Sequence, residues 1–115
     1  MGTDRSLLSG DMALLVLELL REGDLYGYEM TEMLEKRSEN AFHLKAGTLY
    51  PLLHAMERAD WVESYEGESA AGKPRRYYRL TEAGRAALEE KKRAWTTYAA
   101  AMRRVLGGEE HVPEP

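Results

Sequence analysis

The sequence predicts a mainly α-helical domain that contains one β-hairpin and ends in a long helix. Two patterns support this fold class. Apolar residues recur at helical spacing in four segments, and between the third and fourth segments the pattern changes to the alternation typical of strands. The length of 115 residues suits one compact domain with an ordinary hydrophobic core.

Three short helices are predicted over residues 11–22, 27–37 and 46–59. Pro51 lies inside the third helix and is tolerated near its start, where it removes about one backbone hydrogen bond. The apolar stripes of the three helices share i, i+3, i+4 spacing. They consist of Met12, Leu15, Val16, Leu19 and Leu20, then Tyr26, Met30, Met33 and Leu34, and then Leu49, Leu52, Leu53 and Met56.

Two strands are predicted over residues 61–65 and 75–80, with a long loop over residues 66–74 that contains two glycines and one proline. Three helices followed by a hairpin are the element order of a winged helix-turn-helix, in which the hairpin is the wing. We therefore expect a winged helix-turn-helix DNA-binding domain over residues 8–80.

A last helix is predicted over residues 81–106, with Thr81 as its N-cap. At 1.5 Å per residue it would be about 39 Å long, more than one small domain covers. Apolar or long side chains step along it by three and four, as in a dimerisation seam. The expected interface consists of Leu88, Trp95, Tyr98, Met102, Val105 and Leu106, and residues 107–115 are expected to form a disordered tail.

The composition excludes several functional classes. The chain has no cysteine, which excludes disulfides and cysteine-based zinc sites, and its histidines lack metal-ligand spacing. No nucleophile or phosphate-loop motif is present, so we expect neither an enzyme nor a cofactor. The longest apolar stretch, residues 12–20, is too short to span a membrane. A cytoplasmic location without membrane contact is therefore expected.

Positive charge gathers in the predicted wing although the chain carries a net charge of −4. Four cations stand within residues 73–79 and no acid lies among them, which favours phosphate contact. The alternative is cross-strand pairing of Arg76 and Arg79 with Glu63 and Glu66. The four cations are Lys73, Arg75, Arg76 and Arg79.

The outer face of the third helix is a second candidate DNA surface. Lys45, Thr48, Tyr50 and His54 lie there, and hydroxyl groups bind phosphates or base edges. The alternative is that Tyr50 packs into the wing and that His54 is solvated. Residues 45–57 contain no Arg, Asn or Gln for a bidentate base contact, so sequence discrimination would depend on DNA shape.

The last helix also contains an uncharged window over residues 94–102. Trp95 and Tyr98 stand there among several alanines, which would form a slot for a flat apolar ligand across a dimer axis. The alternative is that Trp95 anchors a packed dimer core and that the alanines permit close approach of the helices. Both interpretations require a homodimer.

Three blocks of the sequence resemble the PadR-like family of transcriptional regulators. They are Leu25-Tyr26-Gly27-Tyr28-Glu29, Gly47-Thr48-Leu49-Tyr50-Pro51-Leu52-Leu53 and the wing segment from Gly72 to Gly84. The chain resembles the compact subgroup with a single C-terminal dimerisation helix. Two positions depart from the pattern: Ala46 replaces a frequent proline, and Asp60 replaces a frequent glycine in a turn whose left-handed conformation Asp also tolerates.

The resemblance implies a homodimer that binds double-stranded operator DNA, usually as a repressor, and that often releases it on binding a planar hydrophobic molecule. It places Tyr26, Thr48 and Tyr50 near DNA, together with Lys73, Pro74, Arg75 and Arg76 of the wing. It also places Trp95 in a ligand pocket that Leu8 and Met12 of the partner subunit face, and the expected pocket includes Tyr98 and Ala99. The alternative function is a winged-helix module for protein–protein interaction without DNA binding.

Overall fold

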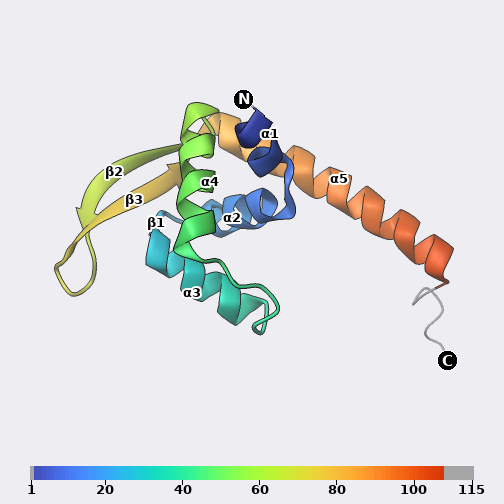
Figure 1. Cartoon of the computed structure of the whole chain (residues 1–115), viewed down its shortest axis with the longest axis horizontal. Coiled ribbons are helices and arrows are strands. Elements are labelled where there is room, and N and C mark those ends of the chain that lie inside the picture. The colour runs from blue at the N-terminus through green and yellow to red at the C-terminus, as the bar shows by residue number, and fades with distance from the viewer. Residues whose placement is uncertain (1, 108–115) are drawn as a thin grey trace.

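The computed structural model describes residues 2–107, and within them it contains five helices and three strands (Figure 1). This order confirms the predicted mainly helical fold with a hairpin and a long last helix. In chain order the elements are α1 (Gly2–Ser9), α2 (Asp11–Arg21), β1 (Leu25–Tyr26), α3 (Gly27–Arg37), α4 (Ala46–Arg58), β2 (Val62–Glu68), β3 (Pro74–Leu80) and α5 (Glu82–Leu106).

Helix α1 is absent from the sequence-based prediction. Its eight residues are too few to establish an apolar period, and Gly10 separates it from α2. The helix packs along α4, where the Asp4 carboxylate accepts hydrogen bonds from Arg58 Nε at 2.8 Å and Nη2 at 2.7 Å. Leu7 and Leu8 are half-buried and pack against the core, so they fix the other side of α1.

The hydrophobic core lies where α2, α3 and α4 meet the base of the hairpin and the first turns of α5. Helix α2 is central: Ala13 and Leu17 are fully buried, whereas Met12 and Leu15 of the predicted stripe are half-buried. All four residues of the predicted α4 stripe are buried. The core consists of Ala13, Val16, Leu17, Leu19, Leu20, Met30, Leu34, Leu44, Leu49, Leu52, Leu53, Met56, Val62, Tyr78, Leu80 and Leu88.

The three strands form one antiparallel sheet in the order β1-β3-β2. Strand β1 has only two residues, which pair with Tyr78 and Tyr77 of β3, and a segment so short shows no alternation in the sequence. The hairpin strands extend further than predicted, because Glu66, Gly67 and Glu68 pair with Arg76, Arg75 and Pro74. The wing loop is therefore residues 69–73, not residues 66–74.

Close contacts define the start of α5. Thr81 Oγ1 accepts a hydrogen bond from the Gly84 N–H at 3.0 Å, which confirms Thr81 as the N-cap. Thr81 also donates from its hydroxyl to the Asp60 carbonyl at 2.6 Å and from its amide to the Trp61 carbonyl at 3.0 Å. Asp60 has φ +69°, so it adopts the left-handed conformation expected for this turn.

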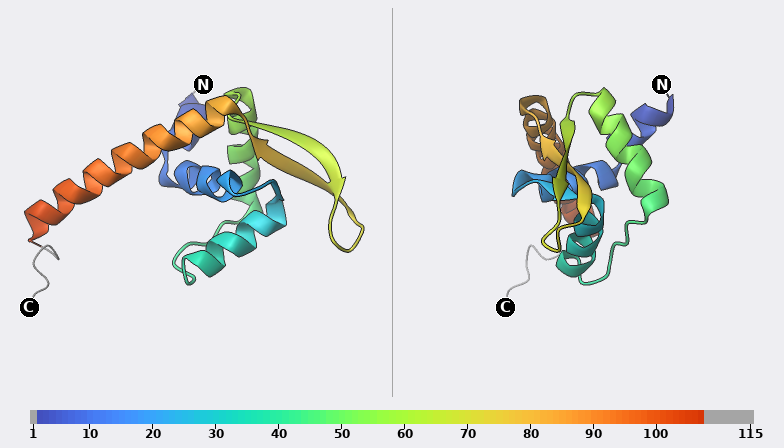
Figure 2. Two further views of the ribbon diagram at one scale, coloured as in Figure 1. Left: turned by 180° about the vertical axis from the view of Figure 1, so that it is seen from behind. Right: turned by 90° about the vertical axis from the view of Figure 1, so that its left-hand side faces the viewer.

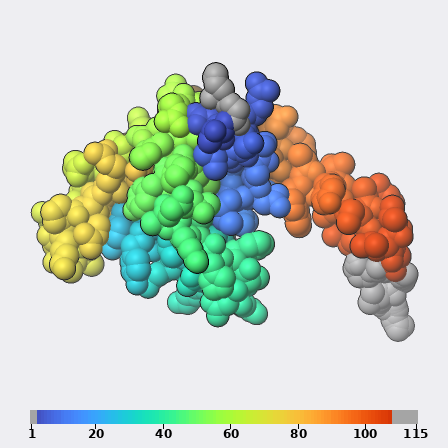
Figure 3. Space-filling model, in the orientation of Figure 1, coloured from blue at the N-terminus to red at the C-terminus, as the bar shows by residue number. Residues whose placement is uncertain are grey.

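Helix α5 leaves the body of the molecule after its first turns, which pack on α2 and β3 (Figures 1 and 2). Its C-terminal half stands clear of the other elements in the space-filling view (Figure 3). The helix ends at Gly107, whose φ of +70° and bond to the Arg103 carbonyl close the last turn. Residues 108–115 of the predicted tail lie outside the described residues.

Candidate nucleic-acid interface and the grooves beside Trp95

Helix α4 buries one face and leaves the other at the surface. Lys45, the residue before its first turn, accepts backbone hydrogen bonds from Thr48 and Leu49 through its carbonyl. The side chains of Lys45, Thr48, Tyr50 and His54 are exposed, as the sequence predicts for a DNA-reading face. The leucines of the same helix are buried in the core and hold α4 in place.

Tyr50 packs against the start of α3. A Cβ atom on Gly27 would collide with the Tyr50 hydroxyl, so only glycine at the start of α3 permits this contact. The ring stays 40% exposed. The Tyr50 ring thus bridges the two helices of the helix-turn-helix.

The four wing cations differ in their surroundings. Lys73 is exposed in the loop, and within residues 2–107 no side-chain hydrogen bond or ion pair involves its ammonium group. Arg76 pairs with Glu66 at 2.9 Å and donates to Ser64 Oγ at 2.9 Å, which confirms the cross-strand alternative for this residue. Arg79 lies opposite Glu63 in register but contacts Asp24 at 3.7 Å instead.

Arg75 and Tyr26 lie together at the junction of the wing and α3. The Arg75 guanidinium lies over the Tyr26 ring, 5.2 Å from its centroid, and donates to the Pro74 carbonyl at 3.0 Å. The Tyr26 amide donates to the Glu29 carboxylate at 3.1 Å, which caps α3. The structure thus brings two predicted DNA residues from distant parts of the sequence into contact.

Two open grooves flank Trp95 where α5 crosses α2, each with a volume of about 380 Å³. We call them the Tyr98 groove and the Phe42 groove. The Tyr98 groove is lined by Ser9, Gly10, Asp11, Leu14, Lys91, Ala94, Trp95 and Tyr98. The Phe42 groove is lined by Asp11, Leu14, Leu15, Glu18, Phe42, Lys92, Trp95 and Thr96.

The grooves include some predicted ligand residues and not others. Trp95 and Tyr98 line them, whereas Ala99 and the Leu8 and Met12 of the same chain do not. Phe42 is one of several groove residues that the sequence did not predict. Its signal is visible in the sequence, because it is the only phenylalanine of the chain and stands in a polar connection after the second helix.

Lys91 lines the Tyr98 groove from α5. Its ammonium group lies over the Trp61 ring, 5.5 Å from the centroid, and burial lowers the pKa of this lysine. The groove therefore combines an aromatic wall, formed by Trp95 and Tyr98, with one positive group and the Asp11 carboxylate. This lining suits a flat apolar molecule that carries a polar edge.

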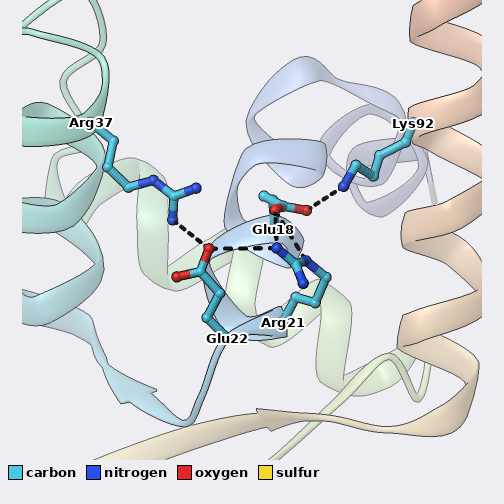
Figure 4. Close-up of polar contacts among 5 residues, drawn as sticks. All are labelled: Glu18, Arg21, Glu22, Arg37 and Lys92. Atoms are coloured by element: carbon cyan, nitrogen blue, oxygen red, sulfur yellow. Dashed lines mark hydrogen bonds and ion pairs between the residues drawn. The ribbon is translucent and has the colours of Figure 1, made fainter.

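A row of five charged side chains connects α5 to α3 beside the Phe42 groove (Figure 4). Lys92 Nζ lies 2.9 Å from Glu18, which also accepts a 2.9 Å hydrogen bond from Arg21 Nη2. Arg21 lies 3.6 Å from Glu22, and Glu22 lies 3.1 Å from Arg37. The hydrogen bond from Arg21 lowers the pKa of Glu18, and Lys92 adds to the effect.

One residue of the expected dimer seam is buried in its own chain. Leu88 is 1% exposed in the single chain, because it packs in the core where α5 starts, and this burial leaves no surface for a partner. The other five residues are exposed along α5, from its crossing with α2 to its end. They are Trp95 (52% exposed), Tyr98, Met102, Val105 (85% exposed) and Leu106.

Other functional sites find no support in the part of the chain that the structure describes. Among residues 2–107 no group of three or more His, Asp or Glu side chains is arranged to hold a metal ion. No helix within this range is long and apolar enough to cross a membrane.

Comparisons with known proteins agree with this arrangement. The model of the transcriptional regulator PadR-like family matches residues 16–90. The transcriptional regulator Rv3488 of Mycobacterium tuberculosis is 40% identical over 96 residues, which cover 84% of this chain and 83% of the relative.

Solved structures extend the likeness beyond the matched segment. A PadR-like transcriptional regulator from Bacillus cereus is 30% identical with a TM-score of 0.76, and the match covers 90% of this chain and 99% of that one. A PadR family transcription regulator from Clostridium difficile is 35% identical with a TM-score of 0.72, over 84% and 99% of the two chains. These relatives regulate transcription, which is not an enzymatic activity. The chain belongs to the PadR-like family of transcriptional regulators.

Proposed function

We propose that this PadR-family regulator acts in the cytoplasm as a homodimeric repressor of transcription. It binds double-stranded operator DNA sequence-specifically and is released by a small, flat, hydrophobic effector. The observation that carries the proposal is the pairing of an exposed α4 face with an exposed cationic wing tip on a chain of net charge −4. Such a focused cation site favours a polyanion over general surface adhesion.

On DNA, the exposed face of α4 lies in the major groove and the wing lies along the neighbouring phosphates. Lys73 supplies an unpaired charge, and Arg76 exchanges its exposed pair with Glu66 for a phosphate at small cost. Because residues 45–57 lack Arg, Asn and Gln, DNA shape supplies much of the discrimination. The contacting residues are Tyr26, Lys45, Thr48, Tyr50, Lys73, Pro74, Arg75 and Arg76.

Two copies pair through the projecting part of α5. Its exposed apolar residues lie on a helix whose C-terminal half stands clear of the other elements, so a second copy is the simplest way to bury them. The interface consists of Trp95, Tyr98, Met102, Val105 and Leu106. A symmetric pair presents two DNA-reading heads, which matches a palindromic operator.

The effector site lies at Trp95 across the dimer axis. The grooves on both sides of this ring support the proposal, and Tyr98 and Ala99 with the partner's Leu8 and Met12 complete the pocket. A flat molecule stacked on Trp95 changes the separation of the two heads, so that they no longer match the operator. A coupling free energy of about 1–3 kcal/mol is sufficient for regulation.

A mobility-shift titration tests the DNA-binding proposal. The probe is a duplex from the region upstream of the protein's own gene, and the control is a duplex of the same composition in scrambled order. We expect the dimer to retard the upstream duplex at a lower protein concentration than the scrambled one. Failure to retard the upstream duplex at low salt would favour the protein–protein interaction module.

The effector proposal has a separate test. A planar hydrophobic dye is added to the protein and the fluorescence of Trp95 is followed in a Trp61→Phe background. We expect quenching of Trp95 together with a loss of affinity for the upstream duplex. Quenching without any change in DNA affinity would show that ligand binding is not coupled to DNA release.

A further inference from the structure

The sheet face that points away from the core carries a row of three tyrosine rings. Tyr65 of β2 stacks on Tyr77 of β3, with centroids 5.6 Å apart and planes 16° from parallel. Tyr77 meets the Tyr26 ring of β1 edge to face at a centroid distance of 5.4 Å. These three residues, which we call the tyrosine ladder, cross all three strands.

Charged groups close the tyrosine ladder at both ends. Arg75 lies over the Tyr26 ring, and the Arg79 guanidinium lies over the Tyr65 ring at 4.7 Å. Asp24, in the turn after α2, accepts a 2.7 Å hydrogen bond from the Tyr65 hydroxyl. The three rings and their charged neighbours therefore form a continuous row of contacts. The row runs from Asp24, in the turn after α2, to Arg75, beside the wing loop.

Two local features keep the central ring in place. A Cβ atom on Gly67 would lie 2.8 Å from Tyr77 Cδ1, so the glycine leaves room for the ring to lie across β2. The Tyr77 hydroxyl donates to the Glu68 carbonyl at 2.8 Å, which ties the ring to the end of the same strand. Both features act on the outer half of the hairpin.

The outer half of the hairpin has little other support. Strand β1 pairs only with Tyr77 and Tyr78, so residues 74–76 and their partners form a two-stranded ribbon. Such a ribbon is marginally stable alone. Aromatic pairs and cation–π contacts contribute attraction beyond the area they bury. They connect the ribbon to Tyr26, which caps α3.

We propose that the tyrosine ladder fixes the direction of the wing relative to α3 and so presents Arg75 to DNA with its guanidinium already oriented. Stacking occupies the face of the guanidinium and leaves N–H donors in its plane for a phosphate. Tyr65 and Tyr77 are then positioning residues, and Tyr26, one of the proposed DNA contacts, also orients Arg75. The proposal rests on DNA binding by the wing, but its structural part is testable without DNA.

The test compares Tyr77→Leu, which removes the central ring, with Tyr77→Phe, which keeps it. Amide hydrogen exchange is measured for residues 64–68 and 75–76 and for α4. We expect Tyr77→Leu to raise exchange in the hairpin but not in α4. Tyr77→Phe keeps the ring and loses only the bond to Glu68, so we expect a clearly smaller rise. Unchanged hairpin exchange in Tyr77→Leu, or equal exchange in the two variants, overturns the proposal.

The DNA arm uses the upstream duplex and a salt series. We expect Tyr77→Leu to lower affinity roughly 2- to 30-fold, the range for residues that act without touching the ligand. The salt slope stays unchanged because the loosened wing still brings every cation to its phosphate in the complex, at the cost of ordering the wing on binding. A lower slope with unchanged hairpin exchange would contradict a positioning role. If the wild type does not bind the duplex, the function proposal fails, while hydrogen exchange still decides the tyrosine ladder.

Tyr65→Phe serves as a second variant in case Tyr77→Leu does not fold. It keeps all three rings and removes the Tyr65 hydroxyl, which donates to Asp24 and also interacts with Arg79. We expect a smaller rise of exchange in the same hairpin residues. Wild-type exchange in this variant would exclude Asp24 as the anchor of the tyrosine ladder and overturn that part of the proposal.

Discussion

Gly84 shows how a single residue sets the junction between the wing and α5. A Cβ atom at this position would collide with the Trp61 carbonyl oxygen, which itself accepts the Thr81 amide. Gly47 occupies the equivalent first turn of α4, but no atom lies within 4 Å of the Cβ position there. The two glycines look alike in the sequence, and only the packing of the chain distinguishes them.

We therefore expect Gly84→Ala and Gly47→Ala to act in opposite directions on stability. Gly84→Ala forces the backbone of α5 away from Trp61 and lowers the free energy of unfolding by about 1–3 kcal/mol. The methyl group of Gly47→Ala meets open space, and this substitution raises the free energy of unfolding by up to about 1 kcal/mol. Denaturant unfolding measures both. Equal stability of the two variants would contradict the close approach at Gly84.

At the scale of the element, α5 combines a buried start with an exposed end. The seam period in the sequence predicted the helix and its apolar face correctly, but it assigned Leu88 to the interface. The sequence pattern of a seam does not show which of its residues pack in their own chain and which remain exposed. That boundary depends on how far α2 and β3 extend along α5, which is a tertiary property.

Pairing through α5 predicts the effect of a charge on its exposed seam. Val105→Glu places a carboxylate in the proposed interface, and because Val105 is 85% exposed the fold of the single chain is not affected. We expect the mass in sedimentation to fall from two chains to one. Arg93→Gln, on the exposed opposite side of α5, changes the net charge by the same amount and is the control. A dimeric Val105→Glu variant would exclude this seam.

The contact between α2 and α5 predicts a dependence of stability on pH. The pKa of Glu18 is lowered in the folded state, so its contribution is present above the unfolded pKa and is lost as pH falls through the folded value. Glu18→Gln should therefore flatten the fall of stability in acid, as measured by denaturant unfolding from neutral pH downward. The control is Glu90→Gln, because Glu90 is an exposed glutamate of α5. An identical acid dependence in both variants would exclude this contribution of Glu18.

At the scale of the whole molecule, the sequence predicted the element order and the family, because periodicity and turn residues are local signals. It did not predict α1 or β1, which are too short to show a period. The sequence also did not predict the contacts between the residues of the site. Arg75 on Tyr26, Tyr50 on Gly27 and Phe42 beside Trp95 each join segments that are distant in the sequence.

The whole molecule is acidic, but its proposed DNA surface is locally cationic. This distribution predicts binding that depends strongly on salt through a few cations, since each neutralised phosphate releases counterions. A protein–protein interaction module would not show this dependence. The number of cations in contact with DNA therefore distinguishes a DNA-binding regulator from a protein–protein interaction module.

The central claim is that the wing contacts DNA, and the salt dependence of binding tests it most directly. Affinity for the upstream duplex is measured by fluorescence anisotropy over a range of salt concentrations for the wild type and for Lys73→Ala. We expect weaker binding by Lys73→Ala and a log–log slope reduced by about two for the dimer, one for each DNA-reading head. Identical slopes and affinities for the two proteins would contradict DNA contact by the wing.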